Sequence, residues 1–232
     1  MDEIGKLKED YHLKKEKIRE RLSQFEKFFN EPYSWHYAGN EMKLLPSEKN
    51  DDERIFEELS FCICTANASA EMGLRSIDAI RNIINAENAD RISERLKGVH
   101  RFSNARAAYI VHTREYLKNT IGFRLKNKIL SFKDKNELRD FFALNKDIKG
   151  LAYKEASHFL RNIGHRNLAI LDRHILKNLK DLKVINDIPK SLSKNKYFEI
   201  EKKFSNFSKE INIPMDELDL LFWSIETGEV FR

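Results

Sequence analysis

The stretch from Ile148 to Ile175, IKGLAYKEASHFLRNIGHRNLAILDRHI, decides how the rest of the chain is interpreted. It begins with a predicted turn around Gly150, which separates two runs whose apolar residues recur at helical spacing. Such a helix–hairpin–helix leaves backbone N–H groups at the start of its second helix, where they suit a phosphate group. The pattern therefore predicts a helix–hairpin–helix over about residues 135–163, with the N–H groups of Gly150 and Ala152 as candidate contacts to a phosphate group.

Two ionisable residues follow this turn at a suggestive spacing. Lys154 falls in the first turn of the second predicted helix, and Asp172 comes 18 positions later (172 − 154 = 18) at the head of another helical run. A helix N-terminus is partly positive and disfavours a cation, so a lysine there is a candidate nucleophilic amine. A solvated surface lysine is the alternative interpretation. Asp172 is a good helix N-cap and also a candidate carboxylate for stabilising a developing cation, and the two roles are compatible.

A hairpin followed by this lysine and this aspartate resembles the helix–hairpin–helix DNA glycosylase superfamily. Within this superfamily, the stretch over about residues 56–232 most resembles the archaeal-type second family of 8-oxoguanine DNA glycosylase/AP lyases. Four segments carry this resemblance: GLAYKEASHFLRNIG (150–164), AILDRHIL (169–176), ELDLLFW (217–223) and TGEVFR (227–232). The resemblance implies an all-α fold in which two helical subdomains enclose a DNA-binding cleft. That cleft would take a nucleotide flipped out of the duplex, because an enzyme cannot reach the base and its sugar inside the stack.

The resemblance also implies a bifunctional enzyme that excises 8-oxoguanine from double-stranded DNA. Lys154 would attack the sugar C1′ and form a Schiff base, from which β-elimination cleaves the strand 3′ to the abasic site. Asp172 would stabilise the sugar cation. No redox cofactor or catalytic metal is expected, and a structural monovalent cation at the hairpin is compatible with the resemblance. The alternatives are the same fold acting on another oxidised base and a non-enzymatic helix–hairpin–helix DNA-binding module.

Further DNA contacts are predicted around the hairpin. Asn67 lies in the short junction Thr65–Ala70, and the resemblance places such a residue in the gap left by the extruded nucleotide; a plain turn asparagine is the alternative. His158 and His174 are candidate phosphate contacts, although core or capping roles are favoured for both. Neither histidine has a spacing typical of a metal site. Relative to the family pattern, Ala152 stands where these hairpins usually carry a second glycine.

The C-terminal tail is the predicted base pocket. The resemblance places the last helix and the last residue around the lesion, where the family usually ends in lysine and this chain ends in Arg232. The charge is kept, but a planar guanidinium differs from an ammonium in geometry. Trp223 is a candidate for stacking on the flipped base or for ordinary core packing. Asp219 is a candidate acceptor for a purine N–H, with capping or surface ion pairing as its alternative.

Composition is compatible with this function but does not select it. The 232 residues carry a formal net charge of +5, which favours a polyanionic partner, while a lysine-rich solvated surface explains the charge equally. The 8 glycines and 4 prolines predict long helices joined by few turns. Because no apolar run approaches a membrane span and no signal-peptide pattern opens the chain, we expect an intracellular protein without a membrane partner. We also expect a monomer.

The two cysteines, Cys62 and Cys64, are separated by one residue within a predicted helix. Side chains at positions i and i+2 of a helix point apart, so we expect two buried thiols and no bridge or shared metal. Iron–sulfur branches of the superfamily carry four cysteines near the C-terminus, and this chain has none there. The cysteine count therefore disfavours that branch.

Periodicity predicts about ten helices in one glycosylase unit. Its subdomains are expected at about residues 1–60 with 183–232, and at about 61–182. Residues 2–30 form a predicted amphipathic helix with Ile18, Leu22, Phe25 and Phe29 on its apolar face. Residues 31–50 are predicted as a loop, and residues 126–135 as a basic connector. A helix over 105–117 is expected to take Ser103 or Asn104 as its cap.

Overall fold

The structure is a computed structural model that describes residues 3–38 and 41–230. Within these ranges it contains eleven helices and one two-stranded antiparallel sheet, which confirms the all-α class. The helices are α1 (Glu3–Asn30), α2 (Asp51–Thr65), α3 (Ala70–Ile80), α4 (Ala89–Leu96), α5 (Ser103–Ile121), α6 (Leu125–Leu130), α7 (Lys135–Ala143), α8 (Tyr153–Asn162), α9 (Arg173–Asp181), α10 (Lys194–Glu210) and α11 (Met215–Thr227). None of the helices in the described ranges is long and apolar enough to cross a bilayer.

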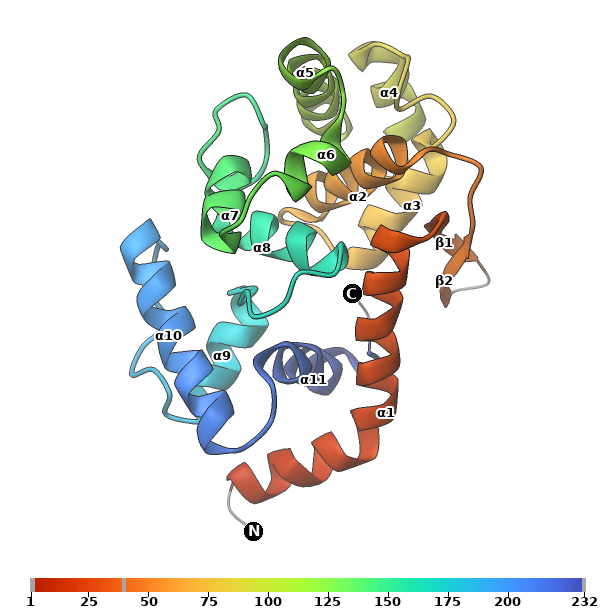
Figure 1. Cartoon of the computed structure of the whole chain (residues 1–232). Helices are drawn as coiled ribbons and strands as arrows, with labels where there is room; N and C mark the ends of the chain where they lie inside the picture. Colours follow the sequence, from red (N-terminus) through yellow and green to blue (C-terminus); the bar gives the residue numbers. More distant parts are fainter. Residues whose placement is uncertain (1–2, 39–40, 231–232) are drawn as a thin grey trace.

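Helix α2 forms the centre of the upper group of helices in Figure 1, and it packs against α3, α5, α6 and α8. Most of its side chains are buried, including both cysteines, as predicted. Below this group, α11 packs against α1, α9 and α10. The chain passes from the upper group to the lower one through the connection between α8 and α9, which carries Asp172. The division into subdomains at the predicted boundaries stays a prediction.

The predicted loop over residues 31–50 is wrong for most of its length. Strands β1 (Tyr33–Ala38) and β2 (Glu41–Pro46) pair there as an antiparallel hairpin, with Trp35 opposite Leu44. Aromatic and apolar residues in short alternation are typical of such strands, but the segment is too short to show a clear period beside Pro32 and Gly39. Trp35 is buried against Phe25 of α1, so it anchors the hairpin to the core.

Three smaller expectations need correction. Helix α6 occupies the first half of the predicted basic connector, because Leu125 and Ile129 bury one side of a short turn of helix. Helix α5 begins at Ser103 with Phe102 at the cap position and no side-chain cap, so neither Ser103 nor Asn104 fills that role. On α1 the predicted Ile18, Leu22 and Phe25 are buried, but Phe28 is buried in place of Phe29, which is only partly buried.

The helix–hairpin–helix is confirmed as α7, a turn and α8. Asp134 caps α7 by accepting the N–H groups of Asn136 and Glu137 at 2.7 and 3.0 Å. The chain then turns through Gly150, whose φ of +80° lies in the left-handed region that favours glycine. Helix α8 starts at Tyr153, so Lys154 lies in its first turn, as predicted.

We expect Gly150→Ala to destabilise the fold by about 1–2 kcal/mol, because alanine is strained in the left-handed backbone conformation. The loss should be larger still, because the added methyl group would press against neighbouring side chains. A methyl group at this position would lie 3.0 Å from Cδ2 of Tyr109 and 3.3 Å from Cγ2 of Ile63. Urea unfolding measures the change. Gly98→Ala is the matched control, because Gly98 also has a φ of +80° but has no atom within 4 Å of an added methyl. Equal losses for the two variants would contradict the contribution of Tyr109.

Candidate active site

A pocket with an empty volume of about 310 Å³ lies where α8, α11, the α2–α3 junction and the segment before α9 meet. Its lining residues are Thr65, Ala68, Ala70, Lys154, His158, Arg161, Ile170, Asp172 and Trp223. The two predicted catalytic residues therefore share one pocket with a predicted base-pocket residue, although they come from separate elements.

Lys154 enters the pocket from the first turn of α8 and is about three-quarters buried. Its Nζ lies 3.8 Å from Oε1 of Glu155, and Oε2 of the same carboxylate accepts the backbone N–H of Ala152 at 3.2 Å. Glu155 thus covers the helix N-terminus, where partial positive charge gathers, and also faces the lysine ammonium. The backbone of Lys154 is fixed in the first turn of α8, and its long side chain reaches into the pocket.

Asp172 is the N-cap of α9, as predicted. Its Oδ1 accepts the N–H groups of His174 at 2.8 Å and Ile175 at 2.9 Å. Both cap bonds use the same oxygen, so Oδ2 is not used by the cap, and the side chain lines the pocket. Capping fixes the carboxylate at a defined place, which suits a group that must stabilise charge without reorganising.

The hairpin offers backbone groups beside the pocket. Ala152 has a φ of −114°, so its methyl group is accommodated without strain, and the residue is exposed. In this structure its N–H group donates to Glu155. The hydroxyl of Thr113 on α5 accepts the N–H of Lys149 at 2.9 Å, which ties the turn to the upper helices.

The predicted base-pocket residues occupy different depths. Trp223 lines the pocket and packs edge-on against His174, with ring centroids 5.0 Å apart. Asp219 lies one helical turn earlier on α11 and is buried, where its Oδ1 accepts a hydrogen bond from Arg161 at 2.9 Å. An ion pair, one alternative for Asp219, is thus present, but it is buried rather than at the surface as that alternative predicted. Arg232 lies outside the described residues.

The two predicted histidines have different surroundings. His158 lines the pocket and packs edge-on against Phe61, with centroids 5.6 Å apart. His174 is half-buried between Trp223 and Glu226, whose Oε2 lies 3.7 Å from its Nδ1. His174 therefore contacts the pocket-lining Trp223 and is not itself among the lining residues.

Asn67 is exposed at the junction of α2 and α3 and has a φ of +58°, a conformation that asparagine tolerates well in turns. The carbonyl groups at this junction accept hydrogen bonds from side chains of the turn before α5 and of α5 itself. His100 donates from Nε2 to the carbonyl of Cys64 at 2.9 Å, and Arg101 and Arg106 donate to the carbonyls of Asn67 and Ala66. The neighbouring Ala68 lines the pocket, so Asn67 lies at its edge.

A family model described as 8-oxoguanine DNA glycosylase matches residues 39–213. The chain belongs to this family. A relative from Methanocaldococcus jannaschii, named 8-oxoguanine DNA glycosylase/AP lyase, is 42% identical over 83% of this chain and 88% of its own length. A relative of the same name from Fusobacterium nucleatum is 38% identical over 93% of this chain and all of its own length.

Solved structures of the family have the same fold. The M. jannaschii 8-oxoguanine glycosylase/lyase in complex with a 15mer DNA containing 8-oxoguanine superposes with a TM-score of 0.81 at 36% identity, covering 97% of this chain and 99% of that one. The 8-oxoguanine DNA glycosylase of Thermotoga maritima gives a TM-score of 0.80 at 31% identity, covering 99% and 98%. The predicted resemblance is thereby confirmed.

Within this glycosylase fold, the pair of Arg161 and Asp219 was not predicted from the sequence. Arg161 lies three residues after His158 and seven after Lys154, so helical spacing alone places it on the pocket face of α8. Both side chains are almost fully buried. Burial raises the pKa of Asp219 to about 7, and nearby Asp172 and Asp216 add to the increase, while Arg161 opposes it.

We expect wild-type protein to lose stability relative to Asp219→Asn as the pH rises from about 4 to about 7. The native pKa of Asp219 is raised above its ordinary value of 3.8, so the stability that its proton contributes is complete below pH 4 and disappears through pH 7. Asparagine mimics the protonated form at every pH. Urea unfolding of both proteins between pH 4.5 and 8 measures the change, expected at a few kcal/mol at most. A difference that does not vary with pH would contradict the raised pKa.

Proposed function

We propose that this protein excises 8-oxoguanine from double-stranded DNA and then cleaves the abasic strand, with Lys154 as the nucleophile. The observation that carries the proposal is the shared pocket of Lys154, Asp172 and Trp223, which joins an amine, a carboxylate and an aromatic face. The names of the curated relatives, 8-oxoguanine DNA glycosylase/AP lyase, support both activities. The complex of the M. jannaschii enzyme supports damaged DNA as the partner.

In the proposed reaction the neutral amine of Lys154 attacks C1′ of the flipped nucleotide. The bond between C1′ and the base breaks, and the base leaves with the bonding electrons and takes up a proton. The nitrogen loses a proton and the sugar ring opens, which gives a Schiff base. Loss of a C2′ proton then expels the 3′ phosphate by β-elimination. Asp172 stabilises the positive charge that develops on the sugar during the first step.

The remaining site residues bind and orient the substrate in this proposal. Trp223 stacks on the flipped base or lines one side of the base pocket. Asp219 and Arg232 are the other proposed residues of this pocket. The Gly150 and Ala152 N–H groups, His158 and His174 contact the DNA backbone, and Asn67 enters the gap in the duplex. Backbone N–H groups at a helix N-terminus suit a phosphate, and an aromatic face suits any base.

No redox cofactor or catalytic metal takes part in this proposed mechanism. The hairpin remains the predicted place for a structural monovalent cation, since carbonyl oxygens of a tight backbone turn are suitable ligands for such an ion. No step of the reaction passes through it. We further propose that the protein acts as a monomer and works inside the cell, on the nucleoid.

Borohydride trapping on defined duplexes tests the function. Wild-type protein is incubated with end-labelled duplexes that carry one 8-oxoguanine, one thymine glycol, one abasic site or no lesion. We expect a covalent adduct and a strand break with 8-oxoguanine and with the abasic site, and neither product with undamaged DNA. An adduct with thymine glycol or the abasic site but not with 8-oxoguanine would overturn the base assignment. No adduct with any duplex would overturn the Schiff-base mechanism and favour a binding module.

A further inference from the structure

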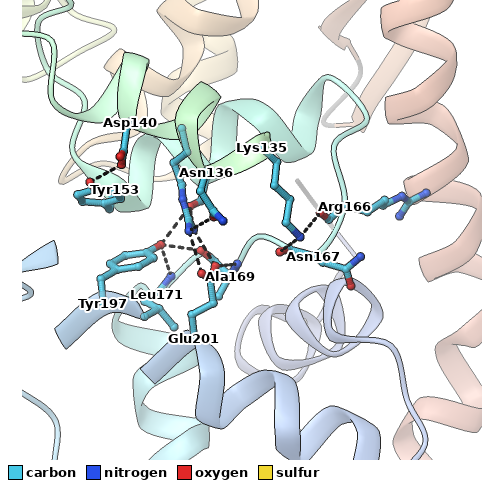
Figure 2. Close-up of polar contacts among 12 residues, drawn as sticks. Lys135, Asn136, Asp140, Tyr153, Arg166, Asn167, Ala169, Leu171, Tyr197 and Glu201 are labelled. Atoms are coloured by element: carbon cyan, nitrogen blue, oxygen red, sulfur yellow. Dashed lines mark hydrogen bonds and ion pairs between the residues drawn. The ribbon is translucent and has the colours of Figure 1, made fainter. Parts of the chain in front are cut away.

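The segment that carries Asp172 has no regular secondary structure, yet it is buried. Leu168, Ala169, Ile170 and Leu171 are each at most 3% exposed. Buried backbone N–H and C=O groups need hydrogen-bond partners, and here no helix or strand supplies them. The partners come instead from side chains of α10, which lies beside this segment in Figure 2.

The hydroxyl group of Tyr197 on α10 forms hydrogen bonds with two residues of the segment. Its oxygen donates to the carbonyl of Ala169 at 2.6 Å and accepts the N–H of Leu171 at 3.3 Å. Glu201, one helical turn later, accepts the N–H of Ala169 through Oε1 at 2.7 Å. The two side chains thus bind three backbone groups of the segment, namely the N–H and C=O of Ala169 and the N–H of Leu171, the residue before Asp172 (Figure 2).

Arg139 of α7 holds Glu201 in place. Its guanidinium donates to both carboxylate oxygens, at 2.7 and 2.8 Å, and its side chain is fully buried. Bidentate arginine–carboxylate pairs have a defined geometry, in contrast to a single flexible contact. The guanidinium also packs on the ring of Phe198, 4.6 Å from the centroid.

The same group reaches the helix that carries Lys154. Arg139 donates to the hydroxyl of Ser157 at 3.2 Å, and the Tyr197 hydroxyl lies 3.3 Å from that same oxygen. Ser157 is three residues after Lys154 on α8, so it lies about one helical turn away. The start of the buried segment is fixed separately, because Asp216 accepts the N–H of Asn167 and Lys135 donates to its carbonyl at 2.9 Å.

From these contacts we infer that Arg139, Tyr197 and Glu201 are positioning residues, which set the place of Asp172 relative to Lys154 during base excision. We call the three residues the clamp. Buried ion pairs contribute little net stability compared with well-packed apolar residues, but they impose a geometry. The clamp joins α7, α8 and α10 to the segment before Asp172. Because α8 carries Lys154, this connection fixes the distance between the Lys154 amine and the Asp172 carboxylate. The inference rests on the proposed function, because it assumes that Asp172 acts in the reaction.

Tyr197→Phe tests the clamp with the smallest change, since it removes the hydroxyl and keeps the ring. We expect the single-turnover rate of 8-oxoguanine excision to fall 10- to 100-fold, on the order that a misplacement of about 1 Å costs. The Kd for the damaged duplex should not change. Tyr153→Phe is the matched control, because that hydroxyl lies in the same aromatic cluster but donates to Asp140 at 2.5 Å and does not touch the segment (Figure 2).

A double-mutant cycle separates positioning from a general structural role. If Tyr197 acts through Asp172, then Tyr197→Phe should slow excision by less than twofold in an Asp172→Asn background. A full 10- to 100-fold loss in that background would overturn the inference, as would an unchanged rate in the wild-type background. Wild-type protein that does not excise 8-oxoguanine would instead refute the proposed function, so the two failures are distinguishable.

Hydrogen exchange gives a second measurement that needs no activity. In Tyr197→Phe without DNA, the amide of Leu171 should exchange at least tenfold faster, while the amide of Ile175 in α9 keeps its protection. Unchanged protection of Leu171 would overturn the inference. If Tyr197→Phe does not fold, Glu201→Asp replaces it in the same assays, because it keeps the charge beside Arg139 and withdraws the oxygen from Ala169.

Discussion

Lys154→Gln will abolish borohydride trapping and lower 8-oxoguanine excision by more than about 10³-fold, the order seen when a covalent nucleophile is removed. Glutamine keeps most of the length and polarity of the side chain but has no amine to attack C1′. In the part of the chain that the structure describes, Lys154 makes one ion pair, a 3.8 Å contact between its Nζ and Oε1 of Glu155. Such partly exposed pairs contribute little to stability, so the melting temperature should change little.

Lys146→Gln is the control for this prediction. It removes the same charge from an exposed position between α7 and the hairpin, and Lys146 is not among the residues that line the pocket. Trapping and excision by Lys146→Gln should match the wild-type values, and both variants should bind the damaged duplex. Trapping that persists in Lys154→Gln would assign the nucleophile to another amine.

Local sequence patterns correctly predicted that Lys154 lies in the first turn of a helix and that Asp172 caps the following helix. Lys154 and Asp172 are recognisable because a turn at Gly150 and two helix starts fix their local geometry over a short stretch. A helix start needs a capping side chain or a suitable backbone turn, and both can be predicted from the types of a few neighbouring residues. The helices α2 and α4 begin in the same way, since Asn50 and Asn88 cap them.

Contacts between distant segments are what the sequence could not show. Arg161 meets Asp219 across 58 positions, and Arg139 meets Glu201 across 62. Each of these residues alone reads as an ordinary charged residue on a helix, because periodicity reports which side of a helix is apolar and not which helix lies opposite. The hairpin of β1 and β2 was missed for a related reason, since its stability depends on Trp35 packing against α1.

Burial of the pair Arg161 and Asp219 has a consequence for the base pocket. Two charges with almost no solvent exposure are costly unless each is well paired. Here Oδ1 of Asp219 accepts from Arg161, while among the described residues Oδ2 accepts no well-formed hydrogen bond and only the backbone N–H of Ile170 acts on the carboxyl group. An unsatisfied buried carboxylate oxygen beside a pocket is a suitable acceptor for an N–H group of a ligand. This arrangement supports the proposed role of Asp219 toward a purine, and it explains why ion pairing and base recognition are compatible.

Asp172→Asn will lower the single-turnover rate of excision by about 10²- to 10³-fold, the order that the loss of one electrostatic stabiliser costs. The substitution isolates the charge of Asp172 from its capping role. Asparagine and aspartate are about equally good N-caps, so the bonds from the N–H groups of His174 and Ile175 are kept. The free energy of unfolding should therefore fall by less than about 1 kcal/mol, through the lost interaction with the helix dipole.

Asp134→Asn provides the matched control, because Asp134 caps α7 in the same way at 2.7 and 3.0 Å and is not among the pocket-lining residues. It should unfold with a similar small change and excise at the wild-type rate. Asp172→Ala completes the series, because it removes both charge and cap and should lose about 1 kcal/mol more stability. If Asp172→Asn excised 8-oxoguanine as fast as the wild type while Asp172→Ala did not, the carboxylate would act on the reaction only by holding α9, and the cation-stabilising role would be refuted.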